Sequence, residues 1–119
     1  MVSRADLDAH WNCRVTTIGR KTGQPRTVTV WFVLDGATLY LTGNADGPQW
    51  TRNMRANGQV SIQIGGTELR GQATVIDDEA QGEEIRQRFL QKYLLAKIGR
   101  ALFGGYTRSV AVVVALEQE

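Results

Sequence analysis

Residues 16–26, TTIGRKTGQPR, contain three cations and no acidic residue. Arg20 and Arg26 carry planar forks of N–H donors that match phosphate oxygens, and Lys21 adds a compact positive charge. Gly23 can adopt a positive φ, so the segment can turn tightly and present backbone N–H groups to an anion. These residue types at this spacing predict a loop that binds a phosphate or carboxylate group and leads into a strand.

The same residues would also suit a solvated basic turn, and residue types alone do not separate the two interpretations. The segment lacks the GxxxxGK[ST] spacing of a Walker A loop and the GxGxxG spacing of a dinucleotide-binding turn. Nucleic acid phosphates would suit the arginines too, but no aromatic ladder accompanies them and the net charge of the chain is only +2. We therefore expect a small anionic partner rather than nucleic acid.

Length and composition indicate one folded domain over residues 1–119. The chain is 42% hydrophobic, which is enough for a single core. Its one cysteine, Cys13, excludes an internal disulfide and favours a reducing compartment. The sequence shows no secretory signal and no apolar run long enough to cross a membrane. We expect a cytoplasmic protein without a stable membrane anchor.

Alternating and β-branched stretches predict five or six strands. Asp35-Gly36 and Gly65-Gly66 are turn signals that join strands into two hairpins. Gly71 lies inside a strand pattern and is a candidate β-bulge. The expected strands cover residues 28–34, 38–42, 60–64, 67–76 and 109–116.

Helical patterns are fewer. Residues 48–56 suit a short helix, and a longer helix begins at about Glu79 and ends at Gly104-Gly105. A second short helix near His10 is an option. These elements predict a mainly β (α+β) fold, a small antiparallel barrel with one long and one or two short helices over its openings. The sheet requires closure or a homodimer, because an open hydrophobic edge would aggregate.

Several short motifs in combination resemble one known family. GRKTGxPR at residues 19–26, PQW at 48–50, NMRAN at 53–57 and VSIQIGG at 60–66 resemble the deazaflavin (F420)-dependent nitroreductases, a group within the flavin and deazaflavin split β-barrel oxidoreductases. The resemblance extends over residues 15–75 and, less strongly, 107–116. It implies a split β-barrel that binds coenzyme F420, an elongated anion with a phosphodiester and several carboxylates.

The resemblance also implies which residues hold the cofactor. They are Thr17 and Ile18 beside the deazaflavin ring, Arg20, Lys21, Thr22 and Arg26 at the phosphate and glutamate tail, and Gly43, Asn44 and Ala45 at the pyrimidine edge of the ring. Trp50 and Asn53 match the short helix of the family, where they would support the loop at residues 43–45 rather than contact substrate.

The implied activity is reduction of a small unsaturated, quinone-like or nitro acceptor by hydride from F420H2. A proton would come from Tyr106, from Asn44 through a water, or from solvent, and the sequence leaves these three routes open. FMN is an alternative cofactor, since it also carries a phosphate. A non-catalytic carrier of F420, FMN, haem or a fatty acid on the same barrel is the alternative function. One histidine and one cysteine give no metal-ligand cluster.

Overall fold

The computed structural model describes residues 4–44, 49–94 and 109–117, and its centre is one sheet of seven antiparallel strands. The order of strands along the sheet is β2-β1-β5-β6-β7-β4-β3. The strands are β1 (Cys13–Ile18), β2 (Pro25–Val30), β3 (Phe32–Asp35), β4 (Thr38–Asn44), β5 (Gln59–Ile64), β6 (Thr67–Ile76) and β7 (Ser109–Leu116).

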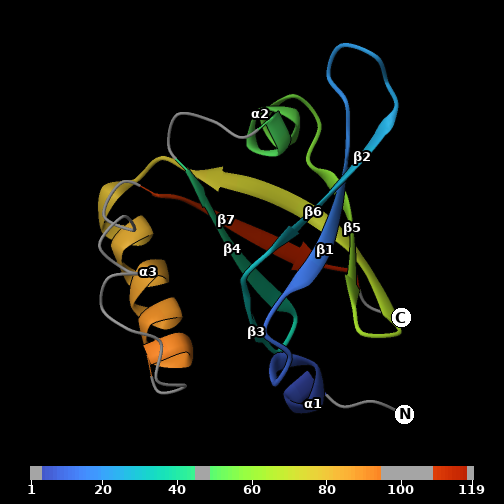
Figure 1. Ribbon diagram of the computed structural model, residues 1–119. Coiled ribbons are helices and arrows are strands. Elements are labelled where there is room, and N and C mark those ends of the chain that lie inside the picture. The colour runs from blue at the N-terminus through green and yellow to red at the C-terminus, as the bar shows by residue number, and fades with distance from the viewer. Residues whose placement is uncertain (1–3, 45–48, 95–108, 118–119) are drawn as a thin grey trace.

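β2 and β3 are the two edges of this sheet, although only Trp31 separates them in the sequence. The chain therefore passes from one edge to the other within one residue, which requires the sheet to curl until its edges lie close together. Figure 1 shows this curled sheet. Val15, Leu41 and Ile62 are fully buried in its apolar interior. The predicted split β-barrel is confirmed.

Two strand boundaries predicted from the sequence are wrong. Residues 28–34 were expected to form one strand, but the chain bends at Trp31 and leaves it outside both β2 and β3. Residues 13–18 were not among the expected strands but form β1, and Pro25 and Arg26, expected in the loop at residues 19–26, belong to β2. β-Branched and aromatic residues continue through the corner at Trp31, so composition does not mark where β2 ends and β3 begins.

The hairpin turns agree with the sequence more closely. Gly65 and Gly66 join β5 to β6, and Gly65 has a φ of 58°. The turn between β3 and β4 consists of Gly36 and Ala37, one position later than predicted, because Asp35 pairs with Thr38.

The predicted bulge at Gly71 is also wrong. Gly71 pairs in regular register with Val60 of β5 on one side and with Leu116 of β7 on the other. A Cβ at this position would lie 2.5 Å from the carbonyl oxygen of Ala115. The glycine is therefore required for a close approach of backbones between β6 and β7.

Within the described part of the chain three helices accompany the barrel: α1 (Arg4–Asp8), α2 (Gln49–Ala56) and α3 (Glu79–Leu94). α1 and α2 lie at opposite ends of the barrel, and α3 lies along its side (Figure 1). α2 contributes Trp50 and Met54 to the barrel core, and α3 packs its Ile85 and Phe89 on the outer face of the sheet. Both helices begin within a residue of the predicted positions. The predicted continuation to Gly104-Gly105 lies outside the described residues.

Side chains, rather than another strand, cover the free edge of β3. The Leu34 N–H donates to Asp8 Oδ1 at 2.8 Å, and Lys92 Nζ donates to the Phe32 carbonyl at 2.9 Å. The hydroxyl of Tyr93 accepts from the Phe32 N–H at 3.1 Å and donates to the Trp11 carbonyl at 2.7 Å. The N–H and carbonyl of Phe32 and the N–H of Leu34 are thereby paired, which disfavours pairing of this edge with a foreign strand.

We expect Tyr93→Phe to lower the free energy of unfolding by about 1–3 kcal/mol, because it leaves the buried Phe32 N–H without its acceptor. Urea denaturation followed by fluorescence measures the change. Tyr40→Phe is the matched control, since the Tyr40 hydroxyl forms no hydrogen bond with any described residue. Equal stability of the two variants would contradict a sealing role for the Tyr93 hydroxyl.

Candidate functional site

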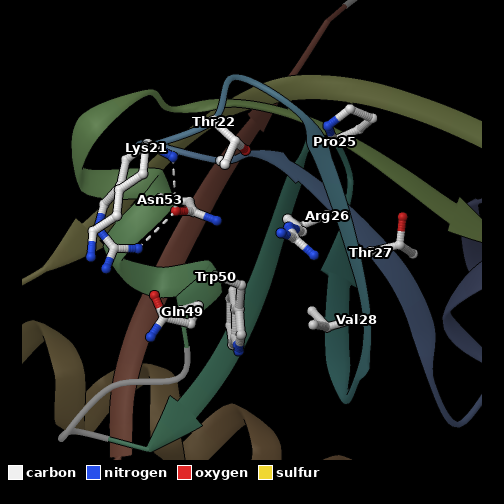
Figure 2. A pocket seen from close by; sticks show the side chains of 11 residues that line it. Lys21, Thr22, Pro25, Arg26, Thr27, Val28, Gln49, Trp50 and Asn53 are labelled. Atoms are coloured by element: carbon white, nitrogen blue, oxygen red, sulfur yellow. Dashed lines mark hydrogen bonds between the residues drawn. The ribbon is translucent and has the colours of Figure 1, made fainter.

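An open cleft of about 750 Å³ lies between the β1–β2 loop, β2 and α2. Arg20, Lys21 and Arg26 provide its cationic side, and Val28 and Trp50 provide apolar surface. Figure 2 shows Arg26, Val28 and Trp50 around the same hollow, with Asn53 behind the loop. The cleft therefore offers positive charge and apolar contact next to each other.

The pairing of β1 with β2 places the Arg26 side chain at the cleft. Val15 pairs with Val28, and Thr17 pairs with Arg26, so all four side chains lie on the same face of the sheet. Val15 is fully buried in the barrel core, and Val28 packs against that core. Arg26 lies two residues before Val28 in β2, so it is on the same face, and it is exposed. The apolar core thus ends where the cationic site begins.

Residues 19–24 form a tightly closed loop between β1 and β2. The Gly19 N–H donates to the Gln24 carbonyl and the Gly23 N–H donates to the Gly19 carbonyl, both at 2.8 Å. The Gln24 N–H donates to Thr22 Oγ1 at 3.2 Å, and Gly23 has the predicted positive φ, 73°. Three loop amides are therefore engaged inside the loop, and anion binding falls mainly to side chains.

Asn53 of α2 joins this loop to β1. Its Oδ1 accepts from the Arg20 backbone N–H at 3.2 Å and from Arg20 Nη1 at 3.0 Å. Its Nδ2 donates to Thr17 Oγ1 at 3.3 Å. Both Asn53 and Thr17 are buried. Asn53 was expected to support the loop at residues 43–45, but it instead bonds to the basic β1–β2 loop, and both Asn53 and Trp50 line the cleft.

The three cations of the cleft form no ion pair with any described residue. The ion pairs among the described residues lie elsewhere, namely Arg55–Asp77, Arg70–Glu68, Arg86–Glu83, Arg88–Asp35 and Lys92–Asp8. Arg20, Lys21 and Arg26 are all exposed at the cleft. Their positive charge therefore remains open to a ligand.

The structure brings together only part of the residues implied by the resemblance. Arg20, Lys21, Thr22 and Arg26 line the cleft. Thr17 is buried beneath the loop and Ile18 is half-buried in β1, and neither lines the cleft. The sequence did not identify Val28 or Gln49 as lining residues. The period of two in β2 carries the signal for Val28, because it shares a face with Arg26.

The remaining predicted residues belong to the segments around β4 and β7. The backbones of Gly43 and Asn44 pair with Val110 and Ser109 at the end of β4. Ala45 and Tyr106 lie outside the described residues. Four residues separate Asn44 from α2, so the end of β4 lies within about 18 Å of the first residue of that helix.

The buried thiol of Cys13 is not suited to nucleophilic chemistry. Burial raises the pKa of the Cys13 thiol to about 12, against a smaller opposite effect of Lys92. The thiol therefore stays protonated at neutral pH and is a poor nucleophile. Within the described residues, no three metal-ligating side chains gather at one point, and no helix combines the length and apolar character needed to cross a bilayer.

Part of the chain is similar in sequence to a protein of known name. The F420H(2)-dependent quinone reductase Rv1261c of Mycobacterium tuberculosis is 36% identical over 53 residues, which are 41% of this chain and 36% of that protein. The matched region thus spans little more than a third of the length of this relative.

Solved structures share the fold at low identity. A protein named F420 Reductase is 20% identical with a TM-score of 0.72, over 99% of this chain and 95% of that chain. An FAD-binding protein from Mesorhizobium loti is 21% identical with a TM-score of 0.67, over 98% of this chain and 91% of that chain. The model of the family described as F420H(2)-dependent quinone reductase matches residues 9–117. With nearly its whole length in that match, the chain belongs to the F420H(2)-dependent quinone reductase family.

Proposed function

We propose that this protein is an oxidoreductase that uses reduced coenzyme F420 to reduce quinone-like acceptors. The observation that supports it most directly is the cleft in which three cations without an acidic partner among the described residues adjoin Val28 and Trp50. F420 combines an anionic tail with a flat ring, and this donor set suits such a molecule. Family membership supports the same cofactor.

Arg20, Lys21 and Arg26 would hold the phosphate and carboxylates of the tail. Trp50 and Val28 would pack against the part of the cofactor that follows the phosphate and keep water from it. When bound, the deazaflavin supplies the hydride chemistry, so the protein needs no nucleophile of its own. This agrees with the protonated state of Cys13.

The ring contacts at Gly43, Asn44 and Ala45, and those at Thr17 and Ile18, stay predictions. The proton donor stays open between Tyr106, Asn44 through a water, and solvent. Nitro and other unsaturated acceptors, a homodimer and a cytoplasmic location are further expectations of the sequence. FMN is the alternative cofactor, and it has fewer anionic groups to match the three cations.

Binding and turnover together test this proposal. We expect the wild-type protein to bind F420 more tightly than FMN, because the longer anionic tail can contact more of the cations. We also expect menadione-dependent oxidation of F420H2, followed by the change in absorbance. Tight F420 binding without turnover of any acceptor would instead identify the protein as a carrier. Tighter binding of FMN than of F420 would assign FMN as the cofactor.

Removal of one cleft cation should weaken F420 binding. We expect Lys21→Ala and Arg26→Ala each to cost about 1.5–3 kcal/mol of binding free energy at low salt, the range of a charge-assisted hydrogen bond. The loss should shrink as salt is added, because solvent ions screen exposed charges. Fluorescence titration measures both effects.

Arg14→Ala provides the control for this pair. Arg14 is exposed on β1, and the alternation of that strand turns it away from Val15 and Thr17. The variant changes the net charge by the same amount without touching the cleft. An equal loss in all three variants would show a general charge effect in place of a site.

The role of Tyr106 can be separated from that of solvent. We expect Tyr106→Phe to lower kcat by less than about tenfold, because solvent can reach an open cleft and supply the proton. Loss of a dedicated general acid would instead lower kcat by about 10²–10⁴. Steady-state oxidation of F420H2 measures kcat, and a titration confirms that the cofactor still binds. A loss of about a hundredfold with intact binding would make Tyr106 the proton donor.

A further inference from the structure

We propose that Asn53 is a positioning residue that fixes the guanidinium of Arg20 as the rigid anion-binding fork of the cleft. The proposed function supplies the identity of the anion, and the geometry of the fork is independent of it. Asn53 lines the cleft but is only 2% exposed, and both ends of its amide are engaged by Arg20 and Thr17, so it acts chiefly through Arg20.

One amide oxygen holds Arg20 at both ends of its side chain. Asn53 Oδ1 accepts from the backbone N–H of Arg20 at 3.2 Å and from Nη1 at 3.0 Å. The start and the tip of this long side chain are therefore tied to the same point. A guanidinium held in this way loses little further freedom when an anion binds.

The donors of Arg20 fix the orientation of the amide, and Thr17 accepts from its other end. Asn53 Nδ2 lies 3.3 Å from Thr17 Oγ1, and Thr17 is fully buried. A flipped amide would place its NH2 group against the guanidinium, donor against donor, so the oxygen must face Arg20. β1, the loop and α2 thus meet at this single side chain.

Asn53 is uncharged, so it can hold Arg20 without cancelling its positive charge. An acidic residue would hold Arg20 as well, but it would neutralise the charge that an anion needs. The amide occupies one of the five N–H donors of the guanidinium and leaves the positive charge in place. Arg20 forms no ion pair with a described residue, in agreement with this role.

Lys21 provides the contrast within the same loop. It is exposed and forms no hydrogen bond with any described residue. Its charge would attract an anion from any of several rotamers, whereas Arg20 presents donors in one direction. Arg20 would therefore set the geometry of recognition, and Lys21 would add affinity that tolerates exchange for another cation.

A double-mutant cycle on the full chain tests the inference, with inorganic pyrophosphate and F420 as separate ligands in calorimetric titrations. We expect Asn53→Ala and Arg20→Ala each to weaken both ligands about tenfold. The double variant should be no more than about twofold weaker than Arg20→Ala alone, because Asn53 acts through Arg20. The control cycle of Asn53→Ala with Lys21→Ala should be additive.

Arg20→Lys and Lys21→Arg keep the inference testable if Asn53→Ala does not fold. Both variants keep the charge at exposed positions. We expect Arg20→Lys to weaken pyrophosphate about tenfold and Lys21→Arg to change it by less than about twofold.

The outcomes separate this inference from the proposed function. Additive losses in the cycle of Asn53 and Arg20, or full affinity in Arg20→Lys, would overturn the positioning role. Coupling seen with pyrophosphate but no binding of F420 would overturn the proposed cofactor and leave the positioning role supported. Failure of the wild-type protein to bind either ligand would overturn both.

Discussion

The antiparallel register of β1 against β2 determines what faces the cleft. Val15 pairs with Val28 in the barrel core. Thr17 pairs with Arg26 on the same face, next to that core and at the cleft. Because successive side chains of a strand face opposite sides, a slip of one residue would turn Val28 outward and remove Arg26 from the site. Barrel stability and the position of the charge therefore depend on the same set of backbone hydrogen bonds.

The cationic mouth has an energetic consequence for the ligand-free protein. Arg20, Lys21 and Arg26 lie within seven residues of sequence, and no described acid offsets their repulsion. Exposure to water keeps the repulsion small, and a neutral amide in contact with Arg20 avoids cancelling its charge. An anion that enters the cleft relieves this repulsion, so ligand binding and loop stability are linked.

Local patterns predicted much of this structure, and long-range geometry accounts for the rest. Alternation and paired glycines located β5, β6 and their turn, and the cationic motif located the charged side of the cleft but not its apolar side. The corner at Trp31 was missed because β-branched residues continue through it. Gly71 looked like a bulge because its actual reason, the carbonyl of Ala115, lies more than forty residues away in sequence. The link from Asn53 to Arg20 spans 33 residues, and neither local patterns nor the resemblance to a family indicated it.

The sealed edge of β3 bears on how the chain folds during synthesis. Asp8 bonds to Lys92 across 84 residues, and the Trp11 carbonyl bonds to Tyr93 across 82. A ribosome delivers the amino-terminal residues first, so β3 emerges long before the side chains of α3 that cover it. Contacts of such high sequence separation form late and slow the folding reaction. The nascent chain therefore passes through a stage in which the Phe32 N–H and carbonyl lack the partners that α3 later supplies.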